Sequence, residues 1–594
     1  MKKSLFLIPT FAMGLTLASC SNDEPTVNTG AGGDFETNYL TVNLVPAPDA
    51  TRAAGNSQTG QPAGDGATYE EGYTSENLVE SVRFYFFNAD GSKATVKADG
   101  TNFFDWNNPD TEGADMPNVE KQLQATVVIN TQNGDRLPAK MVAVINPGAE
   151  GLTATGTAGN MDLSELQSNR TQDYAAAVNA ASPSNFVMTN AVYAEGSGSS
   201  KNIVNSNVIT LDNYGSTPDD AKGKPVNIYV ERNVAKVRVH FDPQSGYVAA
   251  TKRIALKDNQ GEAIMVDGKQ VYLEVSNWNL TAETDKGNLF KNISTWNDDL
   301  FGSRAWNYAP YFRSYWANNA TGAAQHWHNF TEISSLGGKD FTGDLANSIY
   351  ANENAPQTAA ASTTADIEPF TKVILAGKLV YETGAYVEVT KYKGLTIVGE
   401  SNLVASILDN MGSYMIYSYV ENPGSDVSFS SLQAEDVEFK TAFEAGQAQA
   451  GESTTGRYYV YLQLSATGKS KNWTRTDNKD TYQQQAFSAE NNNAAVDSYL
   501  ISNVGKAQIY SGGLTYYYFP IRHLADEAKV GYYGIVRNHI YDCNIKEVTG
   551  LGTPVYRPTE TIYPERPTDE DTYIAAQIKI LSWRLVNQDV NLNW

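Results

Sequence analysis

Short stretches in which apolar and polar residues alternate recur along almost the whole chain. Leu40, Val42 and Leu44 alternate with Thr41 and Asn43 in one such stretch. A two-residue period places these apolar side chains on one face of a β-strand. The same reasoning predicts strands near 78–87, 127–129, 141–145, 228–241, 268–280, 372–382, 457–465, 514–519, 532–548 and 574–580. The chain is therefore predicted to be all-β.

One segment and two boundaries interrupt this pattern. Residues 162–192 contain an Ala-rich run and are the best helix candidate, a minor helical insertion in the N-terminal part. The apolar phase changes near Arg232, which predicts a bulge or bend in a long strand. Turn residues follow at 242–246 and predict a domain boundary near residue 245. Long polar stretches lie at 290–370 and 466–497.

The charge and the rare residue types exclude several classes of protein. Lys and Arg number 44 against 67 Asp and Glu, a net charge of −23 that opposes nucleic-acid binding. Two Cys and five His exclude a disulfide framework and a Cys- or His-rich metal centre.

The N-terminus has the features of an export signal. Lys2 and Lys3 precede a short apolar stretch, which is too short to anchor the chain across a bilayer. The stretch ends in Leu-Ala-Ser-Cys at 17–20, the pattern of a bacterial lipobox, so residues 1–19 are predicted to be a lipoprotein signal peptide and Cys20 the lipidated residue. The alternative is an ordinary secretion signal with an incidental cysteine. Cys543 is expected to be an inert core residue.

A candidate protease site follows the first predicted strand. Residues 21–33 are small and polar, and 53–72 are rich in Gly, Ala and Gln. Arg52 and Ala53 stand at the start of this second flexible segment. An arginine in an exposed flexible segment is a natural site for proteolysis.

The C-terminus ends in an amphipathic pattern. A proline-rich segment at 553–571 is followed by a strand at 574–580. The apolar side chains of the last segment then fall on one parity: Val586, Val590, Leu592 and Trp594. This pattern is compatible with a final core strand and with a strand offered to another molecule by β-strand addition.

No catalytic residue, metal ligand or cofactor is predicted. His326 and His328 share one face of an extended segment, but no third ligand is marked nearby in the sequence. Gly196–Ser199 lacks the context of a hydrolase nucleophile, and no phosphate-binding glycine loop is present. Asp219-Asp220 and Asp298-Asp299 are interpreted as solvated pairs, although paired carboxylates leave a glycosidase open.

Several runs of residues resemble a known family. Tyr516-Tyr517-Tyr518-Phe519-Pro520-Ile521-Arg522-His523, Tyr533-Gly534-Ile535-Val536-Arg537-Asn538-His539-Ile540-Tyr541 and Gly550-Leu551-Gly552-Thr553-Pro554 are similar to the C-terminal signature of the fimbrillins that build type V pili. The resemblance is to the major subunits of the short-fimbria group. Tyr229–Val237, the lipobox, Arg52-Ala53 and the ending Trp583–Trp594 also fit the family's layout, whereas about 290–370 is unmatched.

The resemblance implies two β-sandwich domains of transthyretin-like Greek-key topology, 53–245 and 246–594. It implies an outer-membrane lipoprotein precursor whose propeptide, 20–52, is removed by an Arg-specific protease together with the strand of Leu40, Val42 and Leu44. The groove left open would accept a donor strand, about 585–594, from the neighbouring subunit. The expected partners are identical subunits in a surface filament, accessory anchor and tip proteins, and a host surface or other bacteria. The subunit's place in stalk or tip stays open.

Two other functions stay open from the residues alone. One is a surface lipoprotein that binds glycan through aromatic side chains: Trp306, Tyr308, Tyr311, Trp316 and Trp327. The other is a surface glycosidase.

Overall fold

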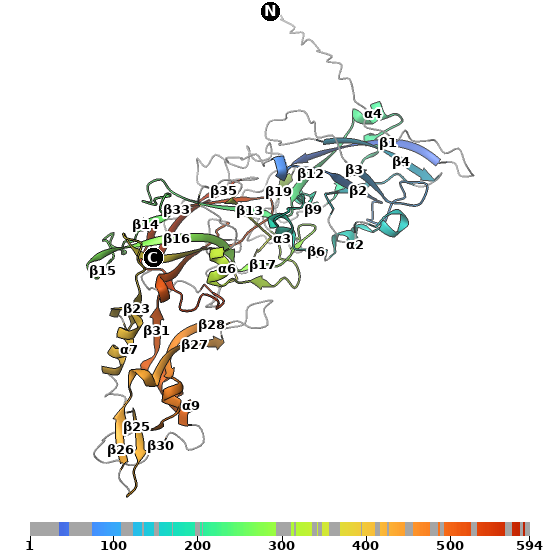
Figure 1. Cartoon of the computed structure of the whole chain (residues 1–594). Helices are drawn as coiled ribbons and strands as arrows, with labels where there is room; N and C mark the ends of the chain where they lie inside the picture. Colours follow the sequence, from blue (N-terminus) through green and yellow to red (C-terminus); the bar gives the residue numbers. More distant parts are fainter. Residues whose placement is uncertain are drawn as a thin grey trace, which may run out of the picture.

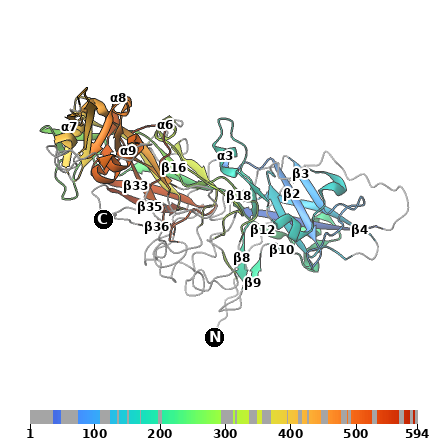
Figure 2. The ribbon, with the colours of Figure 1, turned by 90° about the horizontal axis from the view of Figure 1, so that it is seen from below.

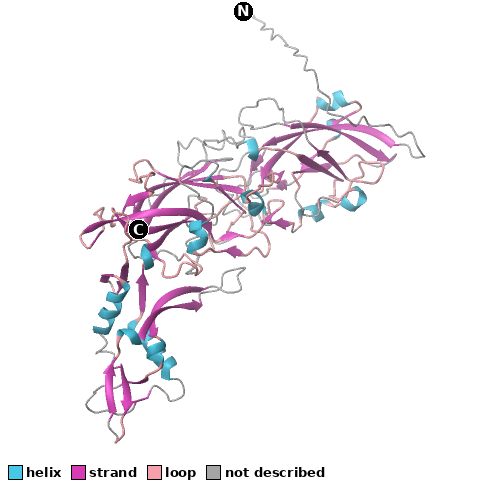
Figure 3. Cartoon of the chain, in the orientation of Figure 1, coloured by secondary structure: helices cyan, strands magenta, loops and turns pink. Residues whose placement is uncertain are grey.

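A computed structural model gives the structure of the chain (Figure 1). It describes residues 35–46, 74–107, 123–132, 136–147, 152, 154–168, 170–195, 202–204, 206–292, 311–313, 317–335, 341, 347–355, 369–393, 395–409, 416–424, 427–445, 456–475, 485–486, 492–523, 532–564, 573–581 and 586–588. Strands dominate these residues and the helices are short, as Figure 3 shows, so the predicted all-β class is confirmed.

The N-terminal part is built on a nine-stranded sheet. Its main path runs β11 (Tyr214–Gly215), β1 (Phe35–Pro46), β12 (Val226–Arg232), β7 (Met188–Asn190), β5 (Lys140–Ile145), β2 (Ser81–Phe87) and β3 (Phe103–Asn107). β4 (Leu123–Gln132) pairs with β1, and β10 (Asn207–Val208) pairs with β5. Apolar side chains from β1, β2, β4 and β5 share one buried core.

A two-layer sandwich follows. One layer has the order β21 (Ile349–Ala351), β13 (Ala235–Phe241), β33 (Ile540–Thr549), β35 (Tyr573–Leu581) and β36 (Val586–Gln588). The other has β14 (Arg253–Ala255), β16 (Lys269–Thr281), β22 (Lys372–Tyr381), β32 (Leu514–Pro520) and β34 (Thr553–Pro554), with β15 (Met265–Val266) beside β16. Alternate side chains of the two layers meet in a second core, as a β-sandwich requires.

The predicted long strand at 228–241 is in fact two strands in different sheets. β12 belongs to the first sheet, whereas β13 pairs with β33 in the second. The chain crosses between them at Asn233 and Val234, just after the change of apolar phase near Arg232. A change of phase therefore marks a change of sheet here, ahead of the turn residues near 245.

A third unit is inserted between β22 and β32, which are neighbours in the sandwich. Its first sheet has the order β24 (Leu395–Val398), β23 (Val389–Tyr392), β31 (Lys506–Ile509), β28 (Gly456–Leu464) and β27 (Val437–Ala445). Its second sheet has the order β26 (Val427–Ser431), β25 (Ile416–Glu421), β29 (Asn472–Arg475) and β30 (Gln485–Ala486). Helices α7 (Glu400–Asp409), α8 (Ala466–Lys469) and α9 (Asn492–Val504) complete it. Figures 1 and 2 place this unit beyond the sandwich, at the end away from the first sheet.

Small elements connect these parts. β18 (Gly287–Asn288) pairs with β6 (Thr171–Gln172), β17 (Glu283–Thr284) pairs with β20 (Gln325–His326), and β19 (Tyr311–Arg313) pairs with β8 (Tyr193–Glu195), which also pairs with β9 (Asn202–Val204). Among the described residues of the predicted helical segment at 162–192, the helices are α2 (Leu163–Gln167) and α3 (Tyr174–Asn179). Further short helices are α4 (Pro218–Lys222) and α6 (Phe330–Ser335). Of the described helices, none has the length and apolar character needed to span a membrane.

Candidate functional site

Strand β1 lies inside the first sheet, with neighbours on both edges. β4 pairs with it in antiparallel register from Phe35 to Leu44. On the other edge, Tyr39 and Leu40 pair with β11, and Val42–Pro46 run parallel to β12. Among the described strands β4 pairs with β1 alone. Removing β1 would therefore expose one edge of β4 and one edge of β12.

The three apolar side chains predicted for this strand are buried. Leu40 and Val42 are 0% exposed and Leu44 is 2% exposed, in the core that also contains Phe84 and Ile129. Burying three such side chains contributes roughly 5–9 kcal/mol. Removing β1 would therefore leave an apolar groove bounded by two unpaired strand edges, and such edges readily pair with a strand of another chain.

Two polar side chains on the other face of β1, Thr41 and Asn43, are also buried, which the alternation did not predict. The hydroxyls of Thr41 and Thr126 lie 2.9 Å apart. The Asn43 side-chain amide donates to Asn227 Oδ1 over 2.9 Å and accepts from Gln124 Nε2 over 2.9 Å. Helix α4 lies beside this strand (Figure 1). An occupant of the groove must therefore satisfy polar partners as well as apolar ones.

The predicted processing residues are outside the described part of the chain. Cys20, Arg52 and Ala53 belong to this group. The last residue of β1 is Pro46, so Arg52 follows the strand by six positions in the sequence. Cleavage at Arg52 would separate the whole of β1 from the folded chain.

The C-terminal strands lie in the two-layer sandwich. β35 pairs with β33 along its length, and β36, which contains Val586, pairs with β35 at the end of the sheet order. Val590, Leu592 and Trp594, the other predicted donor residues, are outside the described residues. β36 has three residues, so its removal breaks few ladder bonds.

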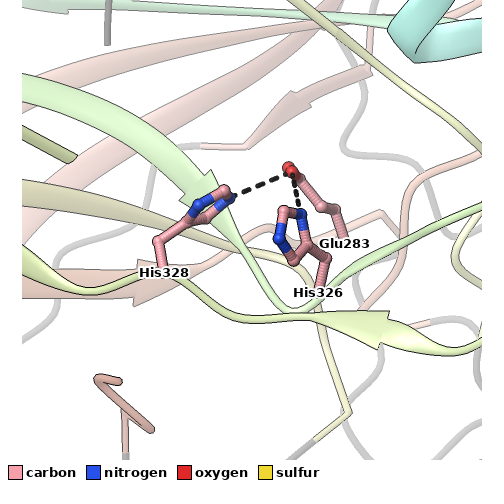
Figure 4. Close-up of side chains that lie close together, drawn as sticks. All are labelled: Glu283, His326 and His328. Carbon is pink, nitrogen blue, oxygen red and sulfur yellow. Dashed lines mark hydrogen bonds and ion pairs between the residues drawn. The ribbon is translucent and has the colours of Figure 1, made fainter. Parts of the chain in front are cut away.

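A cluster of titratable side chains lies away from the groove (Figure 4). Glu283 and His326 are paired positions of β17 and β20, and His328 follows two residues later. His328 Nε2 is 3.2 Å, and His326 Nδ1 3.8 Å, from Glu283 Oε1. Sequence reasoning missed Glu283, because it lies more than forty positions away and is brought in by strand pairing.

Charge pairing shifts two pKa values in this cluster. Burial alone would raise the pKa of Glu283, but hydrogen bonds from His326 and His328 outweigh burial, so the pKa of Glu283 is lowered. The hydrogen bond to Glu283 in turn raises the pKa of His326. Glu283 and His326 thus each favour the charged form.

Other candidates from the sequence are packed in the core. Cys543 is buried in β33, and burial raises the pKa of its thiol well above the usual value, as expected for an inert cysteine. His523 and His539 are buried, and His523 Nδ1 lies 2.9 Å from the Tyr541 hydroxyl. These contacts fit a structural role for both histidines.

The aromatic residues suggested for glycan binding are mostly outside the described residues: Trp306, Tyr308 and Trp316. Tyr311 lies in β19, and the ring of Trp327 packs 5.4 Å from that of Tyr563. A cavity of about 370 Å³ lies beside α3, but Trp327 does not line it.

The C-terminal part matches a known family. Residues 508–589 match the model of the C-terminal region of fimbrillin, major fimbrial subunit protein type IV. The match covers β32, β33, β35 and β36 and includes the tyrosine and Arg-Asn-His runs. The predicted resemblance is therefore confirmed for this segment. No curated protein matches the chain in sequence.

Three solved structures are similar to this chain at low TM-scores. A fimbrilin from Porphyromonas gingivalis W83 is 12% identical, with 92% of this chain and 99% of that chain covered and a TM-score of 0.35. A candidate cell adhesion protein from Bacteroides eggerthii is 12% identical, with 93% and 98% covered and a TM-score of 0.34. A candidate cell adhesion protein from Parabacteroides distasonis is 11% identical, with 91% and 96% covered and a TM-score of 0.32.

Proposed function

We propose that this chain, which carries a fimbrillin C-terminal segment, is a structural subunit of a fimbrium at the cell surface. The family match over 508–589 supports the fimbrial role. The observation that carries the assembly mechanism is the position of β1, a strand paired on both edges that ends shortly before Arg52. The role is structural and not enzymatic.

The proposal continues with export and processing. The precursor is lipidated at Cys20 and reaches the outer membrane as a lipoprotein, where two or three acyl chains hold it firmly. A protease specific for arginine then cuts between Arg52 and Ala53. That cut frees β1 from the folded chain and opens the groove between β4 and β12.

A strand of a second subunit fills the groove in this proposal. The donor is the segment at about 585–594, with Val586, Val590, Leu592 and Trp594 on its apolar face. Apolar side chains replace Leu40, Val42 and Leu44, and main-chain bonds to both groove edges give direction. The contact is head-to-tail, so it propagates into a filament. Accessory anchor and tip proteins and adhesion to a host surface or other bacteria complete the proposal.

Processing is tested with Arg52→Ala and the matched control Thr51→Ala. The Arg52→Ala chain should accumulate as precursor and form no filaments, whereas Thr51→Ala should mature normally. N-terminal sequencing of surface-purified protein reports the cut directly. A mature N-terminus far from Ala53 in the unmodified chain would contradict the assigned site and the removal of β1.

The donor is tested by deleting residues 585–594. If the segment is the donor, the truncated chain should fold and mature but stay monomeric on a gel that preserves heat-sensitive polymers. If it is a core strand, loss of its apolar side chains should cost roughly 2–5 kcal/mol each and unfold the domain. Normal filaments from the truncated chain would contradict the proposed donor.

A further inference from the structure

We propose that Glu283, His326 and His328 form a binding site for one divalent transition-metal ion of the zinc class. The site lies at the β17–β20 pair and is separate from the assembly groove. The three candidate ligand atoms lie within 4.8 Å of one another. Figure 4 shows both imidazoles directed at the same carboxylate oxygen.

The backbone places the three side chains on one side of the strand pair. His326 and His328 are two residues apart in extended chain, so their side chains leave the same face. Glu283 is the cross-strand partner of His326. The rings of His326 and His328 are 4.4 Å apart between centroids. The arrangement is thus set by strand register and not by chance rotamers of a loop.

The spacing suits a small cation. Zinc binds imidazole nitrogen and carboxylate oxygen at about 2.0–2.2 Å, so neighbouring ligand atoms of a tetrahedral site are about 3.3–3.5 Å apart. His328 Nε2 and Glu283 Oε1 are 3.2 Å apart, and His326 Nδ1 is 3.8 Å from the same oxygen. Two nitrogens and one oxygen leave the fourth position for water, or for a ligand from another molecule, on the side of the exposed His326.

A second carboxylate supports the buried imidazole. Glu332 Oε2 lies 3.6 Å from Nδ1 of His328, on the side of the ring away from Glu283. The Glu332 carboxylate is held by the backbone N–H of Asn329 over 3.0 Å, at the start of α6. Histidines that bind metals commonly donate their second nitrogen to such a carboxylate, which orients the ring. His328 is also fixed by its carbonyl, which accepts from the Ile562 N–H over 2.9 Å.

The charges of the site also favour a divalent cation. When ionised, Glu283 and Glu332 can accept hydrogen bonds but cannot donate them, and a neutral imidazole between them offers one N–H and one lone pair. A dication at the Glu283 side leaves the N–H of His328 for Glu332 and balances both carboxylates. The bound ion would then join β17, β20 and the start of α6, and through His328 the segment near Ile562.

The test uses the purified full chain with Cys20→Ser in every protein, because a thiolate also binds zinc. Titration calorimetry with zinc chloride should give one site per chain. His328→Gln and Glu283→Gln should weaken that binding at least tenfold. Glu332→Gln should keep the stoichiometry and weaken affinity about tenfold, as loss of an orienting carboxylate does. His240→Gln, a histidine that pairs with Asp542 elsewhere, is the matched control and should bind as the parent does.

Cobalt(II) provides an independent readout. The parent chain should develop the visible absorption of a tetrahedral nitrogen–oxygen site, and His328→Gln should lose it while keeping its far-ultraviolet circular dichroism. The proposal is overturned if the parent binds no zinc, or if His328→Gln and Glu283→Gln bind it as the parent does. Zinc affinity that falls equally in His240→Gln would also place the ion elsewhere.

Discussion

Individual buried charges hold the first sheet to the sandwich. Arg537 and Glu353 are each 1% exposed and joined over 2.6 Å. The same guanidinium donates to Asn233 Oδ1 over 3.1 Å and to the Leu289 carbonyl over 3.0 Å. Arg537 comes from the matched fimbrillin segment, whereas Asn233 lies where the chain leaves the first sheet. One side chain therefore links both parts.

Arg537→Ala should lower the stability of the folded chain by about 3–5 kcal/mol, because it leaves Glu353 buried without its counter-charge. The control is Arg253→Ala, whose partner Glu274 is partly exposed and whose loss should cost about 1 kcal/mol or less. The midpoint of the urea transition, followed by tryptophan fluorescence, measures both. Equal midpoints for the two variants would refute the assigned role of Arg537.

Asp242 should make the sandwich sensitive to acid. Hydrogen bonds from Lys546, the Gln244 backbone and Asn544 hold the pKa of Asp242 far below its ordinary value. A carboxylate with a lowered folded pKa stabilises above the unfolded pKa of about 3.9, and that contribution is lost as pH falls below it. Asp242→Asn should therefore flatten the loss of thermal stability between about pH 5 and pH 2. Asp219→Asn, at an exposed position, should leave the acid profile unchanged.

At the scale of elements, the sequence predicts the strands that carry one clean alternation. The predicted strand at 268–280 agrees with β16, because Val271, Leu273 and Val275 are buried there and the residues between them are only partly buried. Alternation does not say which sheet a strand enters, so the pattern at 228–241 predicts one strand where the structure has β12 and β13. Helix α8 and the start of α9 lie in the polar segment 466–497 and were not predicted, because each helix buries few residues. Pairing across the sequence, which placed Glu283 at the histidines, leaves no local signal.

The third unit should be removable without unfolding the sandwich. β23 and β31 pair at Thr390–Ile509 and Lys391–Gln508. Deleting 395–504 would connect the end of β23 to the start of β31 through the sequence Gly394-Gly505, and hairpins favour a two-residue Gly-Gly turn. The shortened chain should stay soluble and keep a cooperative thermal transition, with the helical dichroism of α7 and α9 lost. Aggregation of this variant would mean that the unit's core supports the sandwich.

On the scale of the whole molecule, charge opposes the proposed assembly. The full chain carries a formal charge of −23 and the part from Ala53 onward −21, so joining cleaved subunits end to end brings like charges together. The repulsion between exposed charges reaches over a Debye length of about 30 Å at 0.01 M salt but only about 8 Å at 0.15 M. Polymerisation of cleaved subunits, followed by light scattering, should therefore be several-fold faster at 0.15 M salt than at 0.01 M salt. A rate that falls with added salt would instead indicate that complementary charges drive the contact.

The parallel strand pairs also determine how long an early strand waits, during synthesis, for its partner. β1 meets β12 between residues 184 positions apart, and β13 meets β33 across 304 positions. At about 5–20 residues per second, β1 waits roughly 10–40 seconds for β12 to be made. During that interval only β4 can pair with it, and its other edge is uncovered on the nascent chain. The segment proposed for removal at the surface is thus also the first one that a chaperone must shield in the cell.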